Sequence, residues 1–190
     1  MKNVKYILAS ASPRRQELLK FVIDDFICCP SDIEEILPKG IDPLSSPEFL
    51  AVQKALHISK QQPDDIVIGS DTSVFLGDIG FGKPKNREDA KMMLKLLSGN
   101  THKVITGCAL CKGDITYSFS VTSLVEFFPL TEIEIENYLN TNEYKDKAGA
   151  YGIQGYGSTL VKKIDGDFFN IVGLPVARLK REIENFKKLL

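Results

Sequence analysis

Residues 7–17 read ILASASPRRQE, and this stretch joins an apolar, strand-like run to the start of a helix. Pro13 is favoured at the first helical position, because its ring fixes a helix-compatible φ and its missing N–H would have had no partner there. Ser12 is then the expected N-cap of that helix. A strand that leads directly into a helix is the building unit of α/β folds, so this stretch predicts that class.

The same stretch has the composition of an anion site. Arg14 and Arg15 face the positive end of the helix dipole, which costs about 0.3–1 kcal/mol each unless an anion compensates. Helix N–H groups, the hydroxyls of Ser10 and Ser12, and guanidinium forks together match a polyphosphate. The alternative is a solvated basic turn, since surface arginines are common. We take Ser10, Arg14 and Arg15 as candidate substrate-binding residues.

Strand and helix patterns alternate through the first half of the chain. The predicted order is a strand at 4–9, a helix at 13–21, a strand at 26–29, a helix opened by Ser46 and Pro47, a short buried strand at 65–69 and, after a loop, a helix capped by Asn86 and ended by Gly99. This order indicates an α/β fold with helices on a sheet.

The second half begins with a long hairpin, KVITGCALC and ITYSFSVTSLVEFF, joined by a turn at 112–114, so the sheet is predicted to be mixed. Thr131 and Glu134 have capping-box spacing ahead of a helix that runs to about Leu139. The glycine-rich stretch AGAYGIQGYG then interrupts regular structure, and a last helix begins near Pro175. Without a repeat or linker, residues 1–190 are predicted to form a single domain.

The composition argues against several kinds of partner. The chain has 24 basic and 25 acidic side chains, a net charge of −1, and 43% hydrophobic residues. A near-neutral charge argues against broad affinity for nucleic acid or a membrane surface. No apolar run approaches the ~20 residues of a membrane span. We therefore expect a cytoplasmic protein with a small-molecule substrate.

The cysteines are predicted to be buried thiols. Cys108 and Cys111 form a CxxC, but they lie in an apparent strand, where positions three apart point to opposite faces, and no second CxxC completes a zinc site. Cys28 and Cys29 are adjacent, which is poor geometry for a bond between them. Free cysteine often serves as a small core residue.

Asp71 is the strongest candidate for acid–base chemistry. It directly follows IVIGS and is therefore predicted to lie at the end of a buried strand, where ligands bind in α/β sheets. A carboxylate there can bind a divalent cation or take a proton from water. The alternative is a turn residue that ends the strand.

Three further charged residues are candidates with open alternatives. Lys83 lies in GFGKPKN, where Pro84 holds it out of helical geometry, although no Walker loop is present. Lys54 lies on a helix among apolar neighbours and either extends to solvent or faces a charge. Glu35 belongs to an acidic group with Asp32 and Glu34, which either binds a metal or is solvated.

Gln154 lies in GIQG, where flanking glycines would let the backbone approach a ligand and the amide could pair with a nucleobase edge. GIQGYG lacks the spacing and the strand-to-helix context of a dinucleotide fingerprint. The two histidines, His57 and His102, have no metal-ligand spacing, and neither is predicted to be a catalytic base.

Seven short motifs resemble, in order and over essentially the whole chain, those of the Maf family. They are SASPRR at 10–15, QKA at 53–55, SDT at 70–72, GKP at 82–84, LSGNTHKVITG at 97–107, DKAGAYGIQG at 146–155 and GLP at 173–175. The resemblance implies a Maf/inosine-triphosphatase-like α/β fold, with a mixed sheet flanked by helices and two lobes around a central cleft. It also implies a nucleotide pyrophosphatase that uses Mg²⁺ or Mn²⁺.

Carried onto this chain, the family pattern makes Asp71 the proton acceptor. Lys54, Lys83, Arg15 and Glu35 become phosphate or metal neighbours, and Glu35 and Asp71 are the implied metal ligands. We expect cleavage of a nucleoside triphosphate to the monophosphate and pyrophosphate.

The branch of the family that acts on dTTP and UTP has the residues found here as Arg14, Thr72 and Gln154. One departure is Ser70, where the family commonly has alanine. Some relatives are linked to septum formation, so a nucleotide-binding regulator of cell division with slow hydrolysis is the alternative. The resemblance also allows a homodimer, for which the sequence itself has no signal.

Overall fold

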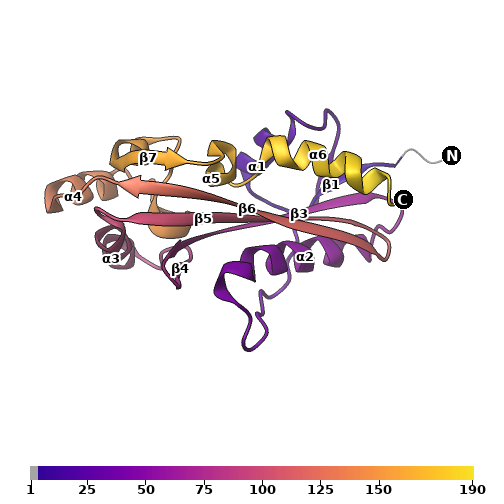
Figure 1. The fold of residues 1–190 in the computed structure, drawn as a ribbon, viewed down its shortest axis with the longest axis horizontal. Helices are drawn as coiled ribbons and strands as arrows, with labels where there is room; N and C mark the ends of the chain where they lie inside the picture. The colour runs from indigo at the N-terminus through magenta and orange to yellow at the C-terminus, as the bar shows by residue number, and fades with distance from the viewer. Residues whose placement is uncertain (1–3) are drawn as a thin grey trace. The chain divides into compact units, whose positions relative to one another are not determined.

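The computed structural model describes residues 4–190 and contains a seven-stranded mixed sheet flanked by helices (Figure 1). The strand order is β2-β1-β3-β5-β6-β7, and β4 pairs with β3 beside this path. β1 is parallel to β2 and β3, whereas β4 is antiparallel to β3 and β7 to β6. The strands are β1 (Tyr6–Leu8), β2 (Ile27–Cys28), β3 (Ile66–Leu76), β4 (Ile79–Phe81), β5 (Thr101–Lys112), β6 (Ile115–Phe127) and β7 (Val161–Asp165). The predicted α/β class with a mixed sheet is confirmed.

The predicted helices begin at or next to the expected residues, and α5 is a further short helix that the sequence analysis does not predict. They are α1 (Pro13–Leu19), α2 (Ser46–Ser59), α3 (Arg87–Leu97), α4 (Glu132–Asn140), α5 (Phe168–Val172) and α6 (Val176–Lys187), with short 3₁₀ turns η1 (Pro43–Ser45), η2 (Ala148–Ala150) and η3 (Tyr156–Leu160). Ser12 and Asn86 each accept a backbone N–H as N-caps, and Thr131 and Glu134 form the complete capping box. Local capping chemistry therefore fixes these boundaries.

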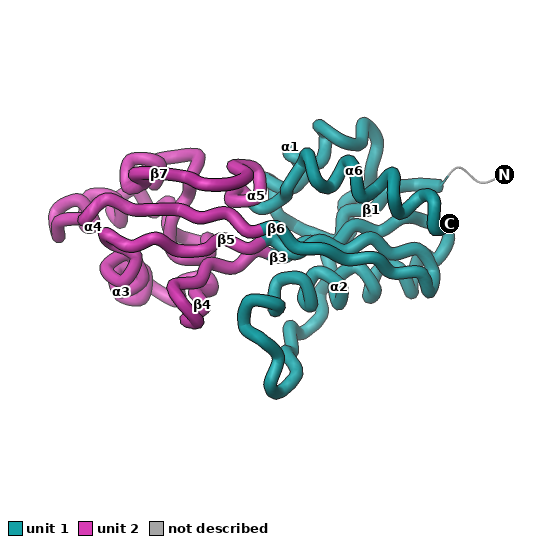
Figure 2. Tube along the Cα trace, viewed as in Figure 1, with its two compact units in different colours: residues 1–71, 106–121, 173–190 teal, residues 72–105, 122–172 magenta. Residues whose placement is uncertain are grey.

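The chain divides into two compact units (Figure 2). The described part of unit 1 comprises residues 4–71, 106–121 and 173–190, and unit 2 comprises residues 72–105 and 122–172. Strands β3, β5 and β6 each contribute residues to both units. The single domain over 1–190 and the central cleft between two lobes stay predictions.

In unit 1, helix α2 covers one face of the sheet, while α1 and α6 lie on the other (Figure 1). The core between α2 and the sheet contains Ile7, Val67 and Ala109 from strands and Ala51 and Ala55 from the helix. Small helix residues allow α2 to approach the strands closely, which fixes where its polar side chains emerge.

In unit 2, ion pairs connect α3 to α4, and an aromatic cluster fills the interior. Glu136 accepts hydrogen bonds from Arg87 and Lys91. The rings of His102, Phe127 and Tyr151 meet edge to face, with centroids 4.8–5.4 Å apart.

Strand β3 is longer than predicted. The sequence predicts a strand at 65–69 followed by a loop, but β3 continues to Leu76, turns at Gly77 and Asp78, and pairs with β4. The cause is the apolar pair Val74 and Phe75, which is buried and keeps the strand in the sheet.

Cys108 and Cys111 are buried as predicted, whereas the prediction is wrong for Cys28, which is exposed on β2 at the end of the strand order.

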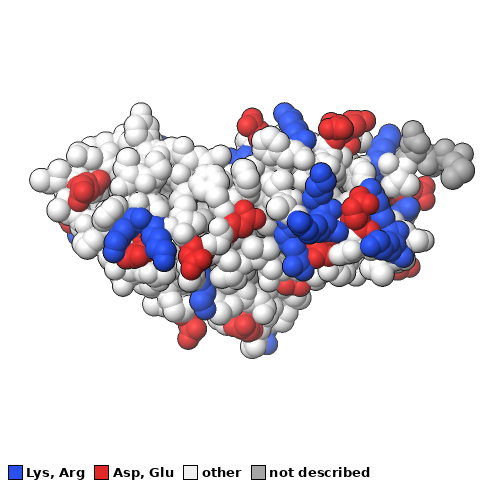
Figure 3. Space-filling view, turned by 45° about the horizontal axis from the view of Figure 1, so that its top comes forward, with Lys and Arg blue, Asp and Glu red and all other residues white. Residues whose placement is uncertain are grey.

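Acidic and basic side chains are interspersed on the face of the molecule in Figure 3. Among residues 4–190, no helix is both long and apolar enough to cross a membrane.

Candidate active site

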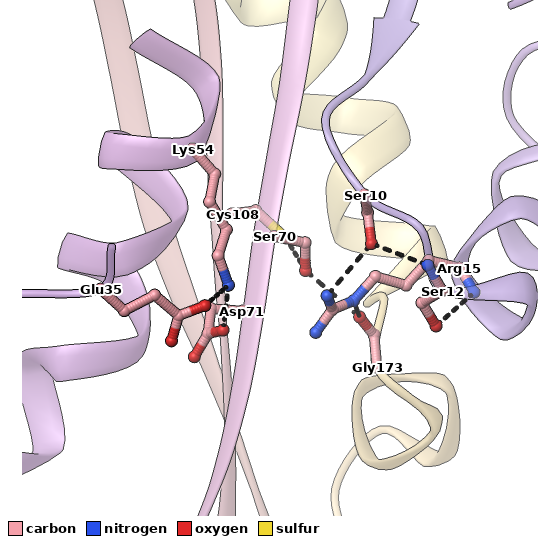
Figure 4. Close-up of polar contacts among 9 residues, drawn as sticks. All are labelled: Ser10, Ser12, Arg15, Glu35, Lys54, Ser70, Asp71, Cys108 and Gly173. Atoms are coloured by element: carbon pink, nitrogen blue, oxygen red, sulfur yellow. Dashed lines mark hydrogen bonds and ion pairs between the residues drawn. The ribbon is translucent and has the colours of Figure 1, made fainter. Parts of the chain in front are cut away.

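Three predicted site residues from distant parts of the chain meet in unit 1, where Lys54 contacts both Glu35 and Asp71 (Figure 4). The Nζ of Lys54 on α2 donates to Oδ1 of Asp71 on β3 at 2.6 Å and lies 2.8 Å from Oε1 of Glu35. The side chains of Lys54 and Asp71 are 13% and 14% exposed, and that of Glu35 is 49% exposed. Lys54 therefore faces two carboxylates, and the alternative that it extends to solvent is wrong.

Two glycines that sequence reasoning missed set the position of Lys54. A Cβ added at Gly69 would lie 2.2 Å from the carbonyl oxygen of Ala51, and one at Gly107 would lie 2.3 Å from the backbone N of Glu48. Only glycine lets the backbone of α2 approach the strands this closely. Gly69 ends the strand predicted at 65–69, and Gly107 ends the motif LSGNTHKVITG, but the sequence alone does not show what either glycine faces.

The segment that carries Glu35 is attached to α2 at two more points. Nε2 of His57 lies 3.2 Å from Oδ1 of Asp32, and Nε2 of Gln53 donates to the carbonyl of Ile36 at 3.3 Å. Consecutive turns of one helix thus hold residues on either side of Glu35. The acidic group at 32–35 is not simply solvated, because Glu35 turns toward Lys54.

A second group of contacts surrounds Arg15. Its Nε donates to the carbonyl of Gly173 at 2.9 Å, and a terminal nitrogen donates to Oγ of Ser10 at 3.4 Å. Oγ of Ser70 donates to the same carbonyl at 3.2 Å. Burial lowers the pKa of Arg15, and the nearby carboxylate of Asp71 opposes that shift. Because an arginine starts from a very high pKa, the guanidinium stays charged at neutral pH.

The predicted position of Asp71 at a strand end is wrong, and the difference matters for the site. Asp71 lies inside β3, because residues 72–76 continue the strand. Successive residues of a strand point to opposite faces. Ser70 therefore points toward Arg15 and Cys108, while Asp71 points toward Lys54 (Figure 4). The dipeptide Ser70–Asp71 connects the two groups of contacts.

Cys108 has no nucleophilic role in this arrangement. Its thiol is buried, 3.9 Å from Oγ of Ser70, and burial raises its pKa to about 12. A thiol with that pKa stays protonated at neutral pH, and the thiolate is the nucleophilic form.

Three predicted site residues lie in unit 2. Lys83 is exposed in the loop between β4 and α3, next to Gly82, whose carbonyl accepts the N–H of Gly149 at 3.1 Å. Gln154 is exposed in a turn ahead of η3, and Thr72 is half-buried on β3. The roles of Lys83, Thr72 and Gln154 stay predictions, as does that of Arg14, which is half-buried in the first turn of α1.

The two carboxylates of the site fit a divalent cation whose other coordination positions are filled by substrate. Glu35 and Asp71 present carboxylate oxygens side by side on one ammonium group. Among the described residues, no group of three or more His, Cys, Asp or Glu side chains could hold a metal ion. Mg²⁺ commonly binds through one or two carboxylates together with substrate phosphates and water. Two carboxylates therefore suffice if a nucleotide supplies further oxygen ligands.

Comparison with solved structures identifies the class of fold. The Ham1 protein of Staphylococcus aureus superposes with a TM-score of 0.58 at 16% identity, covering 95% of this chain and 98% of that one. A Ham1 protein from Coxiella burnetii gives 0.57 at 15% identity, covering 96% and 99%. At this identity the likeness shows a shared α/β fold alone.

The family follows from the sequence comparisons. The model of the Maf-like protein family matches residues 5–186, so this chain belongs to the Maf family. A relative from Bacillus velezensis, named dTTP/UTP pyrophosphatase, is 46% identical over 182 residues, covering 96% of each chain. A relative from Latilactobacillus sakei with the same name is 45% identical over 184 residues, covering 95% of this chain and 99% of its own. The resemblance seen in the motifs is confirmed.

Proposed function

We propose that this protein hydrolyses dTTP and UTP to the nucleoside monophosphate and pyrophosphate. The observation that carries the proposal is the contact of Lys54 with Asp71 and Glu35 in unit 1. The names of the relatives, which are 45–46% identical over nearly the whole chain, support both the reaction and the substrates.

Asp71 is the proposed general base. A carboxylate has two oxygens with several lone pairs, and the contact with Lys54 uses one of these oxygens. Asp71 orients a water molecule toward the α-phosphorus and accepts its proton as the new P–O bond forms. A positioned general base contributes about 10²–10⁴-fold to a rate.

The cationic residues have a different task. The bond from the α-phosphorus to the bridging oxygen breaks, and negative charge builds on the departing pyrophosphate. Lys54, Lys83 and Arg15 supply positive charge for that group, together with the hydroxyl of Ser10. A Mg²⁺ or Mn²⁺ ion held by Glu35 and Asp71 would neutralise phosphate charge and polarise the phosphoryl group when bound.

Base recognition is assigned to Arg14, Thr72 and Gln154. An amide both donates and accepts hydrogen bonds, so Gln154 can match the imide edge that thymine and uracil share. This assignment follows the branch of the family that acts on dTTP and UTP.

Pyrophosphate release from a panel of nucleoside triphosphates, with and without Mg²⁺ or Mn²⁺, tests the proposal. We expect metal-dependent turnover of dTTP and UTP, lost in Asp71→Asn and strongly reduced in Glu35→Gln. Glu34→Gln is the matched control, because Glu34 is an exposed neighbouring carboxylate. Turnover of other nucleotides alone would overturn the base assignment, and no turnover of any would favour the nucleotide-binding regulator.

Other properties remain proposals. The net charge of −1 supports the expectation that nucleic acid is not a partner. The cytoplasmic location, the homodimer and a link to septum formation stay predictions.

A further inference from the structure

The glycine-rich loop at 151–157 in unit 2 is built around a carboxylate of the protein itself. Oε2 of Glu143 accepts the N–H of Gly157 at 3.1 Å. A Cβ added at Gly155 would lie 2.2 Å from Oε1 of Glu143, and one at Gly152 would lie 2.4 Å from the same atom. Neither Gly152 nor Gly155 has a positive φ. A methyl group at either position would therefore displace the Glu143 carboxylate from its present place beside the loop.

The space into which side chains at Gly152 and Gly155 would project is occupied by Glu143. The expectation that these glycines let the backbone approach a ligand stays a prediction. GIQG and the residue that shapes it are separated along the chain, so the sequence gives no sign of their contact.

The segment that carries Glu143 is itself well fixed. The N–H of Glu143 donates to Oγ1 of Thr141 at 3.2 Å, and Nζ of Lys147 donates to the carbonyl of Glu143 at 2.8 Å. The hydroxyl of Tyr138 accepts the N–H of Gly152 at 3.1 Å. Residues 138–147 thus hold the loop at Gly152 and Gly157, on either side of Gln154, whose side chain is exposed.

We infer that Glu143 is a positioning residue for nucleotide selection. Its carboxylate holds the loop in the conformation that presents the Gln154 amide to the base. The inference rests on the proposed function, in which Gln154 recognises thymine or uracil. Glu143 itself takes no part in the chemical step, so its loss raises KM and lowers selectivity while kcat is largely retained.

The test compares Glu143→Ala with Glu143→Gln. In Glu143→Ala we expect KM for dTTP to rise about tenfold, the preference for dTTP over dCTP to fall by a similar factor, and kcat to stay within about twofold. Glu143→Gln keeps a side-chain oxygen that accepts the Gly157 N–H, so it stays close to the wild type. Unchanged KM and preference in Glu143→Ala would overturn the inference.

A double-mutant cycle with Gln154→Ala separates positioning from general damage to the fold. If Glu143 acts through Gln154, adding Glu143→Ala to Gln154→Ala causes no further loss of the dTTP preference. Additive losses would overturn the inference. Should Glu143→Ala fail to fold, Gly155→Ala serves instead, because its new methyl group displaces the same carboxylate.

Amide hydrogen exchange gives a readout that does not need turnover. The Gly157 amide should exchange faster in Glu143→Ala than in the wild type and should regain its protection in Glu143→Gln. Unchanged exchange would refute the role of Glu143 even in an active enzyme. A wild-type protein that hydrolyses no nucleotide would refute the proposed function, and the exchange result would still decide whether Glu143 holds the loop.

Discussion

The two units carry their candidate residues in different ways. In unit 1, Lys54 contacts both Glu35 and Asp71, so the three charged side chains help to position one another. In unit 2, Lys83 and Gln154 are exposed on loops that other residues hold in place. Substitution in unit 1 should therefore affect chemistry directly, whereas substitution around the unit 2 loops should affect binding or stability first.

Among the substitutions that compare the two units, the largest expected effect is the loss of Lys54. Lys54→Ala removes the ammonium group that lies between two carboxylates, which leaves Glu35 and Asp71 close together without it. We expect kcat/KM for dTTP to fall about 10³-fold, or about 4 kcal/mol in transition-state free energy. Lys83→Ala should lower kcat/KM by only about 10–100-fold, because the charge of an exposed cation acts in a higher dielectric.

The control for this comparison is Lys60→Ala, because Lys60 is exposed at the end of the same helix. It should leave kcat/KM unchanged. Equal losses in Lys54→Ala and Lys83→Ala would show that mutual contact in unit 1 is not what distinguishes the two lysines.

The next effect concerns the packing that positions Lys54. Gly107→Ala places a methyl group 2.3 Å from the α2 backbone and should lower the free energy of unfolding by about 3 kcal/mol. Gly82→Ala in unit 2 meets open space at a position without a positive φ, so it should be nearly neutral. Chemical denaturation of both variants tests this contrast. Equal stabilities would mean that α2 can shift without cost.

Local signals in the sequence predict much of the fold. The helix starts at Pro13, Arg87 and Glu132 follow from capping residues, which act within a few positions of themselves. The extent of β3 was missed because burial of Val74 and Phe75 depends on tertiary packing. Periodicity over a short apolar stretch cannot show that packing.

The candidate site was predictable as a set of residue types but not as a geometry. Asp71 and Lys54 lie in separate motifs and Glu35 in an acidic group, and the structure brings the three side chains together. Ser70 and Asp71 point to opposite faces of the sheet because both lie inside β3. The sequence analysis, which ends the strand at Gly69, does not predict this. Gly107 and Glu143 were missed because their importance lies in what they touch, and those contacts are distant in sequence.

A pH-dependent loss of stability is expected from His102 in unit 2. His102 in unit 2 is 1% exposed, and burial lowers its pKa to about 4 from an ordinary value of 6.5. The unfolded chain binds this proton below pH 6.5 while the folded chain does not until about pH 4. The free energy of unfolding therefore falls as pH drops from 6.5 toward 4. At pH 5 it is lower than at neutral pH by about 2 kcal/mol.

Denaturation of the wild type, His102→Gln and His57→Gln at pH 7 and pH 5 measures that contribution. The loss should disappear in His102→Gln and persist in His57→Gln, whose site lies in unit 1. The same loss in all three proteins would assign the pH dependence to other groups.

The smallest expected effect comes from the ion pairs between α3 and α4. Glu136 accepts hydrogen bonds from Arg87 and Lys91, each at 2.6 Å, and these contacts lower its pKa. All three side chains are 30–37% exposed, so solvent and salt screen their charges. Glu136→Gln should lower the denaturation midpoint by only about 1–2 °C, less so in high salt, and leave kcat unchanged. A large fall in kcat would contradict the comparison, because charged contacts in unit 2 would then act on chemistry as those of Lys54 do in unit 1.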